Sequence, residues 1–199
     1  MTTSAAPVQE RPTPRLRHIP GEEGVWIFIF GDMLIFAVLF GTYLHYRSRN
    51  PQLFNHSQLA LNPGFGVVNT LLLLLSSLLV VVAVTALRRK VTGIAAGLIA
   101  GAIACGLAFS VLKVIEYHDK IAAGITPLTN EFFMFYYALT GLHWFHLILG
   151  LAMLTYLLYA SRKPALTAKQ FSWAEGGGCF WHMVDLLWIV LFPLLYLVS

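Results

Sequence analysis

The sequence has too few charged residues to cover a water-facing surface. Only 11% of its 199 residues are charged, whereas 58% are hydrophobic. A soluble domain carries about a quarter charged residues and slightly under half apolar ones. This composition excludes a soluble globular enzyme, and the apolar excess also excludes an intrinsically disordered chain. The sequence is that of an integral membrane protein.

Cysteine is also scarce. Cys105 and Cys179 are the two cysteines, both lie inside apolar segments, and there is no CxxC or CxxCH motif. A disulfide framework, a zinc ribbon and a covalent haem site are therefore excluded. The formal charge of +4 does not indicate a nucleic-acid partner, because the basic residues lie in the gaps between apolar runs.

Five apolar segments are long enough to cross a bilayer, which takes about 20 helical residues. They are roughly residues 25–46, 66–87, 91–115, 132–159 and 177–198. Unbroken leucine and valine runs contradict the alternating pattern of a membrane β-barrel. We therefore predict an all-α integral membrane protein with five transmembrane helices in one bundle.

The first 20 residues differ from the rest of the chain. They are rich in Pro, Thr and Arg and have no apolar stripe. We expect residues 1–20 to form a mobile N-terminal arm and residues 21–199 to form the five-helix membrane domain. No short apolar run ends in a small-residue cleavage site, so we expect the first helix to be retained.

The basic residues are unevenly divided between the two sides of the predicted bundle. Nine of the 13 lie on the side of the N-terminus and of the second and fourth loops, and four lie on the other side. The positive-inside bias therefore predicts a cytoplasmic N-terminus and an external C-terminus. The nine are Arg11, Arg15, Arg17, Arg88, Arg89, Lys90, Arg162, Lys163 and Lys169.

Ionisable groups at bilayer depth are costly, so they are the first candidates for function. Asp32 lies roughly 10 Å inside the first helix, given a rise of 1.5 Å per residue. Asp185 lies at a similar depth in the last helix and shares a face with His182, one turn away. We predict that Asp32 and His182 face each other or share a polar pocket. Asp32 either has a role tied to protons or makes only a packing hydrogen bond.

Two further pairs are spaced three residues apart on single helices. His143 and His146 have the spacing of a metal-binding pair, but a closed metal site needs three or four ligands. We favour hydrogen bonding between helices for both histidines. Lys113 and Glu116 lie near the outer end of the third helix. A haem or dinuclear centre needs several deep histidines on different helices, so we predict no metal or redox centre in this chain.

Small residues mark a predicted packing surface on the third helix. Gly93, Gly97 and Gly101 are spaced four apart, which leaves a flat stripe where another helix can approach closely. Late in the last helix, Pro193 is expected to introduce a bend.

Four motifs resemble those of one family. Residues 180–188, FWHMVDLLW, resemble the YWHFVDxxW signature in the last helix of subunit III of haem-copper cytochrome oxidases. Residues 140–146, TGLHWFH, followed by Gly150, resemble its TGxHxxH segment. Residues 69–77 resemble its NTxxLLxSS stretch, and Glu116 begins its EY pair. The resemblance covers residues 20–199, with each motif on the expected helix.

Two departures from the family pattern refine the resemblance. Long members have seven helices, and this chain lacks the first two, as many bacterial short forms do. The family's buried glutamate, in a segment like SExxFF, is matched here by Asp32 in GDMLIF. The opening GExGxWxFIxGDM of residues 21–33 resembles the accessory proteins of nitric oxide reductase gene clusters (the NorE type).

The resemblance implies a non-catalytic subunit of the bacterial inner membrane, with no metal or haem of its own. Such a subunit packs on the catalytic subunit, which holds the haem and metals, and binds phospholipid. The favoured partner is nitric oxide reductase, in denitrification. The alternative is an aerobic cytochrome c oxidase, in which subunit III supports proton uptake and turnover. A hypothesis from another class is a stand-alone proton channel or transporter, with Asp32, His182 and Asp185 forming its path.

Overall fold

The computed structural model describes residues 23–89, 91–162 and 167–198, and in those ranges it contains helices and no strand. Five helices are long and apolar enough to cross a membrane, which confirms the predicted architecture. The predicted arm, residues 1–20, lies outside the described ranges. The elements are α1 (Glu23–Arg49), α2 (Pro51–Gln58), α3 (Pro63–Arg88), α4 (Thr92–Ala122), α5 (Glu131–Ser161), α6 (Ala168–Phe192) and a π-helical turn, η1 (Pro193–Leu197).

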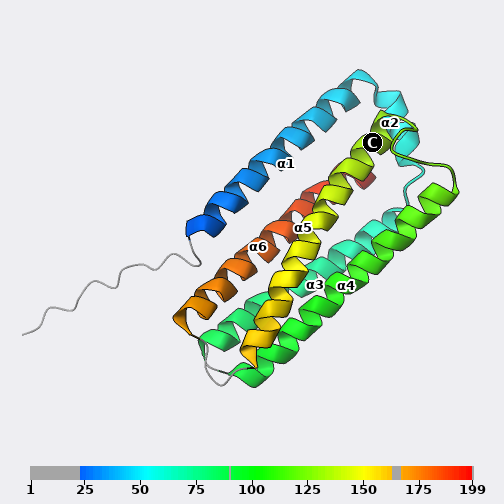
Figure 1. Cartoon of the computed structure of the whole chain (residues 1–199). Helices are drawn as coiled ribbons and strands as arrows, with labels where there is room; N and C mark the ends of the chain where they lie inside the picture. The colour runs from blue at the N-terminus through cyan, green and yellow to red at the C-terminus, as the bar shows by residue number, and fades with distance from the viewer. Residues whose placement is uncertain (1–22, 90, 163–166, 199) are drawn as a thin grey trace, which may run out of the picture.

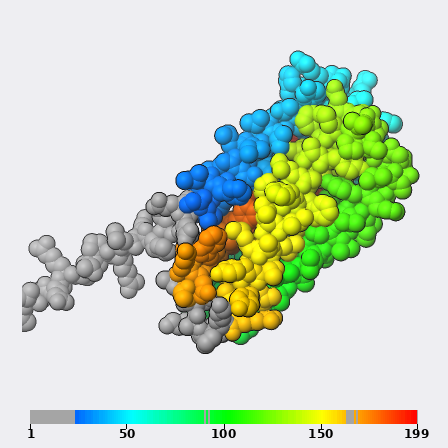
Figure 2. Space-filling view, viewed as in Figure 1, coloured from blue at the N-terminus to red at the C-terminus, as the bar shows by residue number. Residues whose placement is uncertain are grey.

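The five long helices form one elongated bundle (Figure 1). The most extensive interface joins α3 to α4, and α5 and α6 pack on this pair and on each other. At one edge of the bundle, α1 contacts α5 and α6. Viewed from the same side, the surface is made mostly by α1, α5 and α4, and most of α6 lies behind them (Figure 2). Accordingly, 56% of an apolar 18-residue stretch of the last span is buried within the chain, against 17% of such a stretch of the first span.

The two ends of the bundle differ in composition. One end carries basic residues where α3 and α5 end and α6 begins, and we call it the basic end: Arg88, Arg89, Arg162 and Lys169. The other is the α2 end, because the short helix α2 lies there and packs against α5. That the basic end faces the cytoplasm stays a prediction.

Two membrane helices extend beyond their apolar cores. The helix α6 begins at Ala168, nine residues before the predicted segment, because Thr167 and Gln170 form a capping box that starts it. The helix α4 continues past residue 115, where the predicted segment ends, to Ala122. Both extensions are polar, so hydropathy alone misses them, although their backbone is helical.

The last helix changes geometry at its proline. From Pro193 the chain forms a π-helical turn, and the backbone N–H of Val198 donates to the Pro193 carbonyl. Proline lacks a backbone N–H and disrupts the regular α-helical ladder, which is the basis of the predicted bend. The turn carries Tyr196 back into the bundle interior, where it is 7% exposed.

The glycines that position α6 are not those of the predicted stripe. A Cβ atom built on Gly106 would lie 3.0 Å from the Trp181 ring, and one built on Gly150 would lie 2.7 Å from it. One glycine on α4 and one on α5 therefore form the slot that holds this fully buried indole.

The predicted packing stripe is wrong for two of its three members within this chain. Gly93 and Gly97 are exposed, and a Cβ atom on either meets no described atom within 4 Å. A Cβ atom on Gly101 would lie 3.2 Å from Leu79 of α3. Residues four apart drift by about 40° around a helix with 3.6 residues per turn, so the stripe rotates away from the interface.

Candidate functional site

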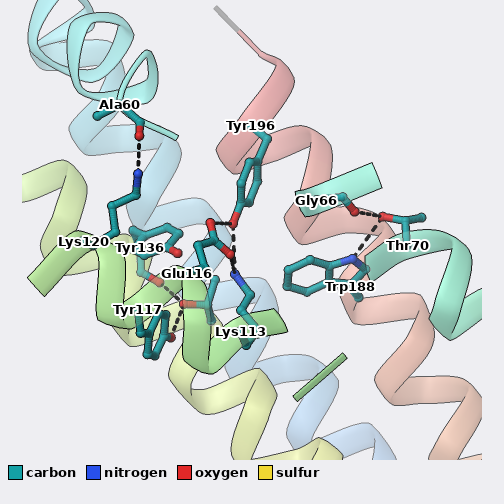
Figure 3. A network of polar contacts seen from close by, with 11 residues as sticks. Ala60, Gly66, Thr70, Lys113, Glu116, Tyr117, Lys120, Tyr136, Trp188 and Tyr196 are labelled. Carbon is teal, nitrogen blue, oxygen red and sulfur yellow. Dashed lines mark hydrogen bonds and ion pairs between the residues drawn. The ribbon is translucent and has the colours of Figure 1, made fainter. Parts of the chain in front are cut away.

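A buried cluster near the α2 end joins α4 to the C-terminal turn (Figure 3). Lys113 Nζ donates to Glu116 Oε2 at 2.8 Å and to the Tyr196 hydroxyl at 2.9 Å. That hydroxyl in turn donates to Glu116 Oε1 at 2.6 Å. Lys113 is only 1% exposed and Glu116 only 2%. Both carboxylate oxygens therefore have a partner, as a buried charge requires.

Aromatic rings enclose the ammonium group of Lys113. The ring centroids lie 5.0 to 5.8 Å from Nζ and belong to four residues, Trp188, Tyr136, Tyr196 and Tyr117. Cation–π attraction adds to the ion pair at these distances. The Tyr117 hydroxyl also lies 2.6 Å from that of Thr140, which links the same region of α4 to α5. This cluster can fix three elements together.

A second buried acid–base pair joins α1 to α5. His146 Nε2 lies 2.9 Å from Asp32 Oδ1, and both side chains are less than a tenth exposed. His146 Nδ1 lies 2.7 Å from the carbonyl oxygen of Leu142, on its own helix. The imidazole ring packs edge-on against Phe36 of α1. This pair is the candidate functional site.

The hydrogen bonds of His146 fix the proton count of this pair. The Leu142 carbonyl can only accept, so His146 Nδ1 carries a hydrogen. The contact between Nε2 and Asp32 Oδ1 then contains one proton. On His146 that proton gives an ion pair, and on Asp32 it gives two neutral groups. The site therefore holds one transferable proton between an imidazole and a carboxyl group.

The predicted pairing of Asp32 with His182 is wrong. His182 points toward α3, where its Nδ1 lies 2.6 Å from the Ser77 hydroxyl. Equal depth on two helices does not set which faces meet, and the face of α1 that carries Asp32 meets α5 instead. Asp185 is buried near His182, and apart from the neighbouring Ser77 hydroxyl neither of its oxygens has a hydrogen-bond partner among the described residues.

The two histidines of the HxxH segment face different helices. His143 Nε2 donates to the Val184 carbonyl of α6 at 3.1 Å, whereas His146 faces Asp32 of α1. Each thus bonds to a neighbouring helix. Within residues 23–89, 91–162 and 167–198, no three His, Cys, Asp or Glu side chains gather as a metal site would require.

Sequence reasoning missed several partners of these groups. Tyr196 lies 80 residues from Glu116, and no local pattern indicates that contact. An ion pair at the basic end, with Arg88 lying 2.8 Å from Glu175, was also missed. Glu175 precedes the predicted last segment, so hydropathy does not mark it as a buried group. It is 6% exposed.

Fold and site together define a class of protein: a multi-pass helical membrane protein with paired charges inside one bundle. The family model described as cytochrome c oxidase subunit III matches residues 21–199. The chain belongs to this family, the third subunits of haem-copper oxidases, and is a multi-pass protein of the bacterial inner membrane.

Individual relatives match over most of the chain. Subunit 3 of the cytochrome bo(3) ubiquinol oxidase of Buchnera aphidicola is 31% identical over 180 residues, which is 87% of this chain and 84% of that protein. Subunit 3 of the cytochrome c oxidase of Alkalihalophilus pseudofirmus is also 31% identical, over 88% of this chain and 85% of that protein. A heme-copper oxidase subunit I+III of Aeropyrum pernix is 28% identical over 87% of this chain and 22% of its own length.

Proposed function

We propose that this chain is a non-catalytic subunit that packs on the catalytic subunit of a haem-copper respiratory complex and supports its turnover. The family match over residues 21–199 supports this proposal. The Aeropyrum pernix relative supports the choice of partner, because its name joins subunits I and III in one protein. In this proposal the haem and metals belong to the catalytic subunit.

The observation that carries the supporting role is the Asp32–His146 pair. Placing a carboxyl group in the least buried membrane helix of the bundle costs free energy, and ionisable groups in membrane helices are usually functional. Here the carboxyl group shares one proton with an imidazole. It also stands where the family resemblance places a buried glutamate. We infer that the pair assists proton supply to the catalytic subunit.

Two partners fit this role. Nitric oxide reductase, acting in denitrification, is favoured by the GExGxWxFIxGDM opening of residues 21–33 and by Asp32 in place of a glutamate. An oxygen-reducing oxidase is favoured by the names of the relatives, which are ubiquinol and cytochrome c oxidase subunits. The two partners differ in the gas that the complex consumes.

Bound phospholipid is part of the proposal. Two adjoining hollows of about 400 and 510 Å³ lie along α5 and α6 toward the basic end, and the larger one also reaches α1. Their walls are apolar, with Met153 and Trp173 shared by both. A hollow of this kind suits an acyl chain, and a tryptophan suits the level of the lipid headgroups.

Copurification identifies the partner. The affinity-tagged chain, isolated in mild detergent from membranes of aerobic and denitrifying cells, should bring a haem-containing protein with it. Consumption of nitric oxide or of oxygen by that complex assigns the partner. A chain that purifies alone, with no haem absorbance under either growth condition, would contradict the proposal and favour a stand-alone channel or transporter.

A further inference from the structure

The seam between α3 and α6 contains a second polar region, distinct from the Asp32–His146 pair. At the basic end, an open hollow of about 240 Å³ lies between these two helices. Its polar lining consists of Thr85 and Arg88 of α3 and Glu175, Cys179 and His182 of α6. A volume of about 30 Å³ per water leaves room for several water molecules.

The rim of this hollow is charged and lies at the basic end of the bundle. Arg88 lies in the last turn of α3 and pairs with Glu175 at 2.8 Å. The Arg88 side chain is 55% exposed, whereas that of Glu175 is 5% exposed. The ion pair thus extends from the exposed end of α3 to the interior of the bundle.

The inner wall of the hollow leads to a buried carboxyl group. His182 lines the hollow, and its ring bonds to Ser77 across the seam. Asp185 lies three residues further along α6, roughly 4.5 Å deeper, and Ser77 lies beside it as well. Asp185 is 3% exposed, and apart from the Ser77 hydroxyl, which also bonds to His182, neither of its oxygens has a partner among the described residues.

A buried carboxyl group with one shared hydroxyl beside it needs further hydrogen-bond donors, because leaving its oxygens unpaired costs more than burying most other polar groups. We propose that water enters the bundle between α3 and α6 at the Arg88–Glu175 pair and extends past His182 and Ser77 to Asp185, which it hydrates. The seam is then a blind, water-filled inlet. Through it the Asp185 carboxyl group exchanges protons with the water on the side of the membrane where the basic end lies. This inference stands apart from the proposed function, because it needs no partner subunit.

Thiol labelling in membranes that contain the full chain tests this inlet. A small, positively charged methanethiosulfonate reacts with thiolates, which form where water reaches the sulfur. Cys179 lines the hollow and Cys105 does not, so the Cys105→Ser chain should react about tenfold faster than the Cys179→Ser chain. Equal rates would mean that water reaches Cys179 no better than Cys105, which would contradict an open mouth.

A pair of neighbouring serines tests the depth of the inlet. In a chain with both native cysteines replaced by serine, Ser77→Cys should react about tenfold faster than Ser76→Cys. Ser76 is the matched control because it faces the dry interior, where it bonds to the Ala102 carbonyl and Trp181. Asp185→Cys should also react, if that chain folds. Failure of Ser77→Cys to react faster than Ser76→Cys would overturn the proposal.

A substitution that fills the hollow tests the route. Gly178 lines the hollow, and a Cβ atom there would contact Val84 at 3.6 Å. Gly178→Leu should therefore slow the labelling of Ser77→Cys about fivefold or more. Gly177→Leu places the same side chain toward Met153 of α5 and should leave the rate unchanged. Unchanged labelling with Gly178→Leu would refute entry between α3 and α6.

Discussion

The two buried acid–base pairs of this bundle differ in how completely their hydrogen bonds are satisfied. In the Lys113–Glu116 pair, both oxygens of the carboxylate have donors, and four aromatic rings surround the ammonium group. In the Asp32–His146 pair, Oδ2 of the carboxyl group has no hydrogen-bond partner within the described part of the chain. The first pair joins α4 to the C-terminal turn, and the second joins α5 to the exposed edge helix α1.

This contrast separates a structural ion pair, Lys113–Glu116, from a proton site, Asp32–His146. We call the structural pair the brace. The amine of Lys113 and both carboxyl oxygens of Glu116 have hydrogen-bond partners, so the Lys113–Glu116 pair contributes through its complete hydrogen bonding. The Asp32–His146 pair holds one proton between two groups that can each carry it, so this pair can change state. The predictions below test this distinction, from the largest expected effect to the smallest.

The largest effect is expected when one half of the brace is removed. Glu116→Gln leaves the ammonium group of Lys113 buried without a countercharge, which should cost about 3–5 kcal/mol of stability. The thermal unfolding of the purified chain in detergent would measure this loss. The double variant Lys113→Met, Glu116→Gln should recover part of it. A single variant as stable as the parent would contradict the brace.

Overpacking the Trp181 slot should come next. Gly150→Leu places a side chain where a Cβ atom alone would lie 2.7 Å from the indole, and it should cost about 1–3 kcal/mol or more. Gly97→Leu is the control, because that position is exposed and meets no described atom within 4 Å. Expression level and thermal unfolding compare the two. A more harmful Gly97→Leu would mean that this face is covered in the assembled complex.

At the proton site, stability and turnover should respond differently. Asp32→Ala leaves His146 Nε2 buried without a partner, which should cost about 1–3 kcal/mol. Asp32→Asn can donate to Nε2 instead, so its unfolding temperature should stay close to that of the parent chain. Without a transferable proton on residue 32, however, this variant should lower the turnover of the complex, whereas Asp32→Glu should retain much of it. Normal turnover with Asp32→Asn would leave Asp32 a packing role only.

The smallest effect is expected at the neutral hydrogen bond between Trp188 and Thr70, near the brace. Thr70→Val preserves the shape of the side chain but removes the acceptor for Trp188 Nε1, which lies 3.1 Å away, together with a bond within α3 to the Gly66 carbonyl. We expect a loss of about 0.5–1.5 kcal/mol in thermal unfolding. Thr155→Val is the matched control, because the exposed hydroxyl of Thr155 bonds within its own helix, to Leu151. Equal losses of stability in the two variants would mean that the Trp188 hydrogen bond does not contribute to stability.

Hydropathy and residue spacing predicted the five membrane helices and placed Asp32, Glu116 and the two histidines at buried positions. These features are local, because a run of apolar residues and a spacing of three are visible within one helix. The partners across helices were not visible in the same way. Depth along the bilayer is readable from sequence, but rotation about each helix axis is not. For that reason His182 was predicted opposite Asp32, and His146 occupies that place.

Packing surfaces were harder to predict for a related reason. The stripe of Gly93, Gly97 and Gly101 is visible in sequence. Gly106 and Gly150 lie on different helices, and their shared role becomes visible only when both are seen to contact Trp181. The Lys113–Glu116 spacing was visible, but its third member, Tyr196, is placed by the π-helical turn after Pro193. Such contacts depend on tertiary packing.

The most direct test of the account is the activity of the catalytic partner with and without this chain. The purified partner should be assayed alone, with the parent chain, and with the Asp32→Asn chain. We predict that the partner alone catalyses its reaction but loses sustained turnover, that the parent chain restores it, and that Asp32→Asn restores assembly without full turnover. A partner with no activity alone would contradict a supporting role, and so would a partner whose turnover is the same with and without this chain.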